Sequence, residues 1–501
     1  MPPEPQVSGY TRATMDRRAK IVATLGPASS SEEVLARLLE TGVDVVRLNM
    51  SHGDHAGHRK VIENLRRLAR EQHRFVPIII DLMGPRYRLG EVDSGPRQLD
   101  AGEEVFLGTR SHPGDLPIGE PELLDHLQVG ERMLIDNGMV ELEILACHPD
   151  GVTTRVVHGG PVATRKGINL PDTDLPFTIS EKDHDDIAFA LDEGADYLAV
   201  SFVGGPKDLE AIRNVLRAHG GMLPLVAKLE RAAVLRHLDA TVEASDAVMV
   251  ARGDLGVELP VHDVPILQKK IIAAGRRVGK PVIVATQMLE SMMTQPRPTR
   301  AEASDCANAI FDGADALMLS GETAAGVDPV KVVGTMSKII VEAEAYRPPS
   351  MEDFSGRQPE PLRPGASEQM NFNPELDRHL EVPDVVSAAA VYATHRLDVR
   401  QIVAFSQGGF TARMIARYRP RTPITVFTRQ HNVARRLQLV WGARPLLLED
   451  ELEHHEQVVR LVERRLLAAE LAKPGDVIII LMGVPISNRP FTNLMRVHRV
   501  R

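Results

Sequence analysis

Eight short apolar runs recur along the first two thirds of the chain and constrain its fold more than any other feature. They are rich in Val, Ile and Leu without polar alternation, which is typical of parallel strands covered on both faces. Most are separated by helical patterns such as SEEVLARLLETG, which begins with a Ser N-cap and ends in Gly. Eight such units predict an α/β fold of the TIM (β/α)8 barrel class, with its active site at the carboxyl ends of the strands. The runs are residues 21–27, 43–53, 76–85, 195–203, 224–230, 246–256, 281–291 and 314–323.

Three segments depart from this pattern and predict an inserted domain, a linker and a C-terminal domain. Residues 86–173 contain short runs such as EEVFLG, MVELEIL and TTRVVH between Gly, Pro and Asp, and they predict a small β-domain inserted on a barrel loop. Residues 347–380 are rich in Pro and polar residues and predict a linker or excursion. Residues 381–501 carry a second α/β pattern and predict a C-terminal domain. The predicted barrel then comprises residues 19–85 and 174–346, after an N-terminal tail of residues 1–18.

Composition excludes several classes of protein. The formal charge of −9 argues against a general nucleic-acid-binding face. Two cysteines, Cys147 and Cys306, provide neither a disulfide framework nor a thiolate zinc site, so a reducing cytoplasm is expected. The sequence has no apolar run of membrane-spanning length and no apolar N-terminal segment, so neither a membrane span nor a signal peptide is expected.

The stretch PLVAKLER, residues 224–231, places a lysine and a glutamate at the end of a predicted buried strand. Successive strand side chains point to opposite faces, so Lys228 and Glu230 share a face. Asp254 follows the next predicted strand, and we expect it close to Glu230. Two carboxylates, completed by water and a substrate oxygen, suit a small hard cation, and Lys228 beside it would meet anionic oxygens. A buried Lys–Glu pair without a metal is the simpler alternative.

Other strand ends carry further polar side chains. Arg47, Asn49 and Ser51 share one face of the second run, and a guanidinium suits a carboxylate or phosphate. Asp81 ends the third run and Thr286 the seventh, so both are expected at the same mouth, although a single strand threonine is usually structural.

Basic residues flank the predicted insert. Arg88 lies at its entrance and Arg165-Lys166 near its exit. A basic residue at each hinge would close on a polyphosphate, whereas each one alone is more simply a solvated surface charge.

Several distinctive segments extend from about residue 18 to the end of the chain. They are RLNMSHG, KGINLP, SEKD, KLE, EASDAVMVARGDLGVELP, PVIVATQMLESM, PRPTRAEASDCANAIFDGADALMLSGETA, ARYRPRTPI and FTNLMRV. Together these segments resemble the pyruvate kinase family. The resemblance implies transfer of the phosphoryl group of phosphoenolpyruvate to ADP, giving ATP and pyruvate. It also implies a barrel domain, an inserted β-barrel lid, a C-terminal effector domain, a homotetramer and a cytoplasmic location, without nucleic-acid or membrane partners.

The resemblance implies a role for individual residues. It assigns Glu230 and Asp254 to a divalent metal, Mg²⁺ or Mn²⁺, and Lys228 to stabilisation of the transferring phosphoryl group. Catalytic or substrate-binding positions are Arg47, Lys228, Gly253, Asp254 and Thr286. A hydroxyl has a high pKa, so Thr286 is interpreted as an orienter of the proton donor. Nucleotide positions are Asn49, His52, Arg88 and Lys166, and monovalent-cation positions are Asn49, Ser51, Asp81 and the carbonyl of Leu82.

One departure from the family pattern concerns potassium. Potassium-dependent members carry Thr-Lys-Gly-Pro-Glu after the third-strand aspartate, whereas Leu-Met-Gly-Pro-Arg follows Asp81 here. The fixed charge of Arg86 then replaces that of K⁺, and K⁺ is expected not to be required. The alternative is that Arg86 points into solvent and changes nothing.

A second departure concerns the effector. Residues 406–411, SQGGFT, match a phosphate-binding turn before a helix and predict a phosphorylated effector at Ser406, Gly408, Gly409 and Thr411. Gly408 replaces a hydroxyl residue, and MGVPISNRPFTN replaces a more glycine-rich loop, so AMP or a hexose phosphate is as plausible as fructose 1,6-bisphosphate.

Two other functions are alternatives to phosphoryl transfer. A metal-dependent lyase or aldolase acting on a pyruvate enolate would not need the lid or its basic residues. A non-catalytic effector-binding homologue would not need to keep Lys228, Glu230 and Asp254, all of which are present.

Overall fold

The computed structural model describes residues 17–92, 95–109, 115–346, 374–448, 455–483 and 491–501. These residues divide into two compact units. The first comprises the chain up to Ile80 with Glu193–Tyr197 and Ile272–Arg501, and the second comprises Asp81–Asp192 and Leu198–Ile271. Most of the predicted tail and linker, residues 1–16 and 347–373, lies outside the described residues.

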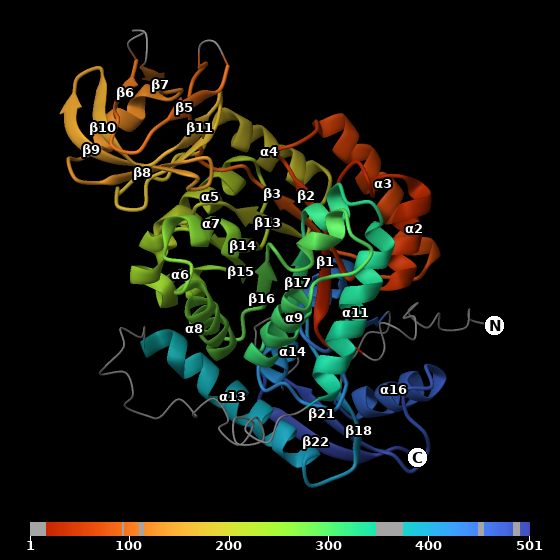
Figure 1. Ribbon diagram of the computed structural model, residues 1–501. Helices are drawn as coiled ribbons and strands as arrows, with labels where there is room; N and C mark the ends of the chain where they lie inside the picture. The colour runs from red at the N-terminus through yellow and green to blue at the C-terminus, as the bar shows by residue number, and fades with distance from the viewer. Residues whose placement is uncertain (1–16, 93–94, 110–114, 347–373, 449–454, 484–490) are drawn as a thin grey trace. The chain divides into compact units, whose positions relative to one another are not determined.

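Eight parallel strands form a closed barrel, as predicted, and follow one another around it in chain order (Figure 1). Nearly all their side chains are buried, which explains the apolar runs in the sequence. The strands are β1 (Lys20–Leu25), β2 (Val45–Asn49), β3 (Ile78–Asp81), β13 (Tyr197–Val200), β14 (Leu225–Leu229), β15 (Ala247–Ala251), β16 (Val282–Ala285) and β17 (Ala316–Leu319).

Helices follow the strands, and local capping fixes where they begin and end. Ser31 caps the first by accepting a hydrogen bond from the Val34 amide, and Gly42 ends it in the left-handed region at φ 118°. Thr299 and Glu302 form a capping box at another helix, which Gly313 ends at φ 98°. The helices are α2 (Glu32–Thr41), α3 (His55–Glu71), α4 (Glu181–Asp192), α5 (Pro206–Ala218), α6 (Leu238–Ala244), α7 (Arg252–Glu258), α8 (Val264–Arg277), α9 (Arg300–Asp312), α10 (Gly321–Ala324) and α11 (Pro329–Ala345).

The insert between β3 and α4 is β-rich, as predicted, and has a core of its own. It contains a seven-stranded sheet in the order β4-β12-β8-β9-β10-β6-β7 and a two-stranded sheet of β5 and β11. Buried aliphatic side chains such as Leu107, Ile135 and Leu142 form the core. The strands are β4 (Tyr87–Arg88), β5 (Arg97–Leu99), β6 (Glu104–Gly108), β7 (Leu116–Pro117), β8 (Arg132–Ile135), β9 (Val140–His148), β10 (Gly151–His158), β11 (Gly160–Val162) and β12 (Gly167–Asn169).

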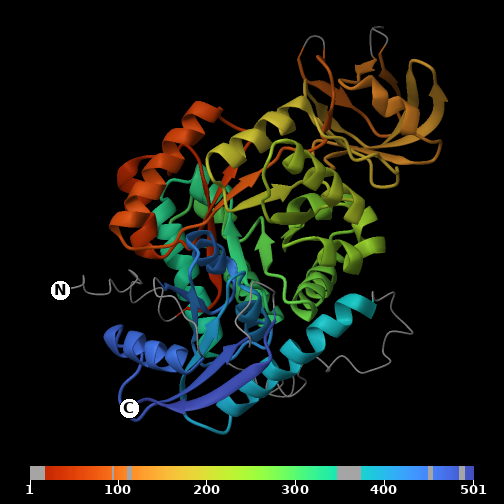
Figure 2. The ribbon, with the colours of Figure 1, turned by 180° about the vertical axis from the view of Figure 1, so that it is seen from behind.

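The C-terminal domain is an α/β sheet with helices on both faces (Figures 1 and 2). Ile402 and Ala404 pack in one core with α13 and α14, whereas Val403 packs in another with α16, as the period of two in a strand requires. The sheet order is β20-β19-β18-β21-β22, with only β22 antiparallel. Its elements are α13 (Pro374–Thr394), β18 (Val399–Phe405), α14 (Phe410–Ala416), β19 (Ile424–Thr428), α15 (His431–Arg436), β20 (Ala443–Leu447), α16 (His455–Ala468), β21 (Val477–Met482) and β22 (Leu494–Arg499).

Candidate active site

Lys228 is the centre of a buried polar cluster in the second compact unit. It lies on β14, where its backbone is in register with Met249 of β15, and its side chain is 9% exposed. Its Nζ donates to the Ser201 hydroxyl at 2.6 Å, and lies 2.9 Å from Glu230 Oε1 and 3.3 Å from Asp81 Oδ1. Buried ammonium groups are costly unless they are paired, so these three oxygens are what keep a lysine at this strand end.

Ser201 links the lysine to the end of β3. It follows β13, and its hydroxyl donates to the Leu82 carbonyl at 2.8 Å. The carbonyl predicted for a monovalent cation is therefore hydrogen-bonded to Ser201 in this structure. Sequence reasoning missed Ser201, because an isolated serine after a strand gives no signal of its own.

Glu230 follows β14 and is buried with its two oxygens in different environments. Oε1 faces Lys228, and Oε2 accepts a hydrogen bond from the Phe202 amide at 2.7 Å. Burial raises the pKa of Glu230, Lys228 opposes that rise, and the charge of Asp254 adds to it. Like charges that interact raise the pKa of a carboxyl group, and Asp254 acts on Glu230 in this direction.

Asp254 and Gly253 lie in the first turn of α7, directly after β15. Two carboxylates in mutual repulsion favour a bound cation, because a cation offsets the charge that raises the pKa of Glu230. The donor set therefore fits a divalent metal that keeps most of its ligands as water. Among the residues that the structure describes, no cluster of three or more His, Cys, Asp or Glu side chains forms an alternative metal site.

A cavity of about 220 Å³ opens beside these carboxylates within the same compact unit. Asp254 lines it together with five basic residues, which are Arg86, Arg88, Arg165, Lys166 and Arg231. The predicted hinge residues Arg88 and Lys166 thus share one cavity. Lys166 pairs with Asp136 at 2.7 Å, and Arg88 donates to the Arg165 carbonyl at 3.0 Å. A cavity of this charge suits a polyanionic ligand.

Glu258 is a further acid in this cavity that sequence reasoning missed. It accepts a hydrogen bond from the Ala232 amide at 2.9 Å. Burial raises its pKa to about 7, with the hydrogen bond and Arg231 opposing. Its burial depends on tertiary packing, and GVELP in the sequence does not reveal that.

Arg86 lies over the ring of Phe202, with its Cζ 5.6 Å from the ring centroid. This cation–π contact holds an exposed guanidinium at the rim of the cavity. Phe202 itself has a positive φ of 57°, in the region that bulky residues avoid.

The remaining predicted residues, which lie on or after β2, after β16 and near the start of α14, belong to the first compact unit. Arg47, 8% exposed on β2, donates to the Thr24 hydroxyl at 3.1 Å. The Asn49 side chain accepts from the Ser51 amide at 3.1 Å, and its carbonyl accepts from the His52 amide at 3.2 Å. These contacts order the polypeptide after β2 as a tight turn.

Thr286 follows β16 in a strained conformation. Its φ is 66° and that of Gln287 is 53°, while its hydroxyl donates to the Ala285 carbonyl at 2.6 Å. A β-branched residue with positive φ costs about 1–3 kcal/mol and is found mainly at functional sites. Backbone strain is a signal for Thr286 that the sequence does not carry.

The predicted effector turn lies at the start of α14. Gly409 is the N-cap at φ 78°, and a side chain at Gly408 would meet no atom within 4 Å. Thr411 is buried, and its hydroxyl lies 2.7 Å from that of Thr492. Residues 484–490 of the neighbouring loop lie outside the described residues.

The fold and this site define a class: a parallel eight-stranded barrel enzyme with a lysine–carboxylate cluster at its strand ends and a basic cavity beside it. Family models for "Pyruvate kinase, barrel domain" and "Pyruvate kinase, alpha/beta domain" match residues 16–333 and 384–498. The chain belongs to the pyruvate kinase family. Within the described residues, no helix combines the length and apolar character that crossing a bilayer requires.

Individual relatives agree over the whole chain. A pyruvate kinase of Mycobacterium intracellulare is 41% identical over 490 residues, covering 97% of this chain and 99% of that protein. One of Geobacillus stearothermophilus is 39% identical over 499 residues, covering 97% and 80%. A solved pyruvate kinase from Cryptosporidium parvum matches with a TM-score of 0.87 and 32% identity over 98% of each chain. The lyase and non-catalytic alternatives find no support in these similarities.

Proposed function

We propose that the protein transfers the phosphoryl group of phosphoenolpyruvate to ADP, and that the Lys228 cluster is where it does so. The observation that carries the proposal is the buried ammonium of Lys228, held by Ser201, Glu230 and Asp81 at strand ends. Phosphoryl transfer needs fixed positive charge on the equatorial oxygens of the moving group and on the enolate left behind. A preorganised lysine supplies that charge without reorganisation during the reaction.

Glu230 and Asp254 would hold the divalent metal, Mg²⁺ or Mn²⁺, that the family requires. When bound, it neutralises negative charge on the phosphoryl oxygens. The protein's own contribution is to orient the Glu230 carboxylate. The Phe202 amide does this for Glu230 by donating to Oε2, and Lys228 does it from the other side.

Substrate and proton contacts are assigned to Arg47, Gly253 and Thr286. Arg47 is buried on β2 with a guanidinium suited to the carboxylate or phosphate of phosphoenolpyruvate. The strained turn at Thr286 fixes the direction of a hydroxyl that orients the proton donor to the enolate, and its hydrogen bond to Ala285 supports that role.

The nucleotide is assigned to Asn49, His52, Arg88 and Lys166. Support comes from the basic cavity that Arg88 and Lys166 share at the root of the insert. The insert would act as a lid over ADP. A phosphorylated effector at Ser406, Gly408, Gly409 and Thr411 is supported by the open space at Gly408, while the Thr411–Thr492 contact would have to open for that hydroxyl to bind phosphate. We further propose a homotetramer that acts in the cytoplasm.

Replacing Lys228 by Met tests the assignment of the site. Removing one donor aimed at transition-state charge typically costs roughly 10²–10³-fold in kcat, and we expect at least that loss in pyruvate formation. Lys331→Met, on the exposed face of α11, is the matched control and should keep full activity. Comparable kcat values for the two variants would show that Lys228 does not stabilise the transferring group.

A further inference from the structure

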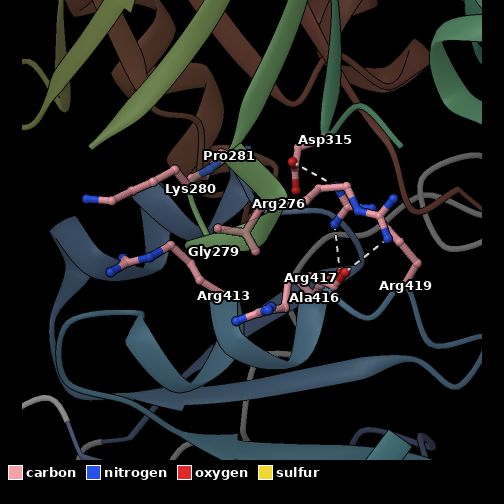
Figure 3. A pocket seen from close by; sticks show the side chains of 10 residues that line it. Arg276, Gly279, Lys280, Pro281, Asp315, Arg413, Ala416, Arg417 and Arg419 are labelled. Atoms are coloured by element: carbon pink, nitrogen blue, oxygen red, sulfur yellow. Dashed lines mark hydrogen bonds and ion pairs between the residues drawn. The ribbon is translucent and has the colours of Figure 1, made fainter. Parts of the chain in front are cut away.

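A small cavity lies between the barrel and the C-terminal domain, within the first compact unit (Figure 3). Its walls come from the end of α8 and the turn before β16, from the residue before β17, and from α14 and the residues after it. Its volume of about 10 Å³ is close to the space that one water molecule needs. Its charged lining residues are Arg276, Lys280, Arg413, Arg417, Arg419 and Asp315.

The lining has five cationic groups and a single carboxylate. That carboxylate already accepts three hydrogen bonds: Asp315 Oδ2 accepts from Arg419 at 2.9 Å and from the Val282 amide at 3.0 Å, and Oδ1 accepts from the Trp441 amide at 3.1 Å. Arg417 has its own counter-ion on α13, where its Nη1 lies 2.9 Å from Asp384 Oδ1. One carboxylate therefore faces several cations in the cavity.

Buried guanidinium nitrogens at this cavity lack acceptors. In the described part of the chain, the Nε atoms of Arg276, Arg417 and Arg419 are buried without a hydrogen-bond partner. Arg276 donates from Nη2 to the Arg417 carbonyl at a long 3.3 Å. Burial, the charge of Arg419 and that of Arg417 lower the pKa of Arg276 to about 10, against the opposing effect of Asp315. Buried donors without acceptors are rare in folded proteins and need an explanation.

The cavity has a closed side and an open side. Arg276 and Arg419 lie next to one another beside Asp315, whereas Lys280 and Arg413 extend the other way from the same cavity (Figure 3). Lys280 and Arg413 are partly exposed, and Arg413 Nη1 donates to the Gly408 carbonyl at 3.3 Å. An anion entering from that side would meet these two cations at the mouth and guanidinium groups within the cavity.

We propose that this cavity is a binding site for a small oxyanion, the phosphate group of either inorganic phosphate or a phosphorylated metabolite, with Arg276 and Arg419 as its donors. Each of these guanidinium groups has one buried Nε–H without an acceptor, and a phosphate oxygen would supply one through a charge-assisted hydrogen bond. The effector turn at residues 406–411 ends in the first residues of α14, whereas Arg417 and Arg419 of the cavity follow the end of that helix. Arg413 of the cavity reaches the turn, because its Nη1 donates to the Gly408 carbonyl at 3.3 Å. The proposed site is independent of the phosphoryl-transfer site.

Calorimetric titration of the full-length protein tests the proposal. Inorganic phosphate and, separately, AMP are titrated at constant ionic strength set with chloride, into wild type and Arg276→Gln. A hydrogen bond to a charged group predicts roughly tenfold to hundredfold weaker binding at one class of site in the variant. Arg276→Lys keeps the charge without the planar fork and should fall in between. If only AMP responds, the phosphate group comes from a metabolite; if both respond, inorganic phosphate suffices.

A control variant separates this cavity from charge elsewhere on the surface. Arg400→Gln changes an exposed arginine of β18 and should leave this class of binding unchanged. Without phosphate, Arg276→Gln should melt no lower than wild type, because it removes a buried charge whose Nε has no acceptor. Phosphate should then raise Tm in wild type only. Identical titrations and equal phosphate-induced Tm shifts in wild type and Arg276→Gln would show that the cavity holds only water.

Discussion

At the scale of residues, Lys228 and Glu230 show what the sequence of a single strand can predict. Their spacing of two predicts a shared face, and the structure places Nζ 2.9 Å from Oε1. Ser201 and Phe202, which complete the cluster, escape prediction because they act through a hydroxyl and a backbone amide on another strand. The strain at Thr286 and the burial of Glu258 are likewise consequences of tertiary packing, which one sequence does not display.

Lys20 gives a stability prediction at the same scale. It is buried on β1, its Nζ donates to the Ala443 carbonyl at 3.0 Å, and burial lowers its pKa from 10.5 to about 8. Below pH 8 the buried Lys20 is charged in the folded protein, which lowers the free energy of unfolding. Between pH 8 and 10.5 the unfolded chain binds more protons than the folded one, so stability rises with pH by up to roughly 3 kcal/mol from this group.

The measurement is the Tm of wild type minus that of Lys20→Met across pH 7–10. The difference should be constant below pH 8 and grow in favour of wild type above it. Lys331→Met should show no such trend, since its lysine is exposed. A difference that is flat with pH would mean that Lys20 titrates normally in the folded protein.

Arg86 carries the prediction about potassium. Its guanidinium stays protonated at any working pH, and two unit charges about 4 Å apart repel by roughly 4 kcal/mol at an effective dielectric of 20. We expect substantial activity of wild type in buffer free of Na⁺ and K⁺. Arg86→Glu should lower that activity and make it respond to added K⁺, whereas Arg86→Lys should behave as wild type. A tenfold activation of wild type by K⁺ would show that Arg86 does not replace the ion.

At the scale of elements, apolar runs predict strands well when both faces are buried. All eight barrel strands and four strands of the C-terminal sheet come from such runs. β22 does not, because none of the side chains of LMRVHR is fully buried. The helix α13 begins at Pro374, inside the segment up to residue 380 that the sequence predicts as a linker. The sequence does not predict the first turns of this helix, because they are polar and show no helical period of apolar residues.

The insert provides a prediction at this scale. Its entry strand β4 and exit strand β12 are hydrogen-bonded to each other, with Gly167 opposite Arg88, so both hinges form one two-stranded connection. Because the insert has its own core, replacing residues 86–173 by a short Gly/Ser linker should leave the barrel folded by circular dichroism. Phosphoryl transfer to ADP should be lost, since Arg88 and Lys166 go with it. Normal transfer by the deletion variant would exclude a role as lid.

At the scale of the whole molecule, sequence similarity identifies the family to which the domains belong, which local patterns of apolar residues do not. Family models and relatives cover the barrel and C-terminal domain together, so the domain order follows from them as well as from the apolar runs. We expect four chains per particle by mass photometry at nanomolar concentration. A monomer or dimer under those conditions would contradict the proposed homotetramer.

The central claim is that this protein moves a phosphoryl group from phosphoenolpyruvate to ADP with a divalent metal held at Glu230 and Asp254. Phosphorus NMR of the purified full-length protein with phosphoenolpyruvate, ADP and Mg²⁺ tests it most directly, because donor and acceptor resonances are followed together. We predict loss of the phosphoenolpyruvate signal with equal growth of the γ-phosphate signal of ATP, and no change when EDTA is in excess. Consumption of phosphoenolpyruvate with release of inorganic phosphate alone, or no consumption at all, would contradict the account.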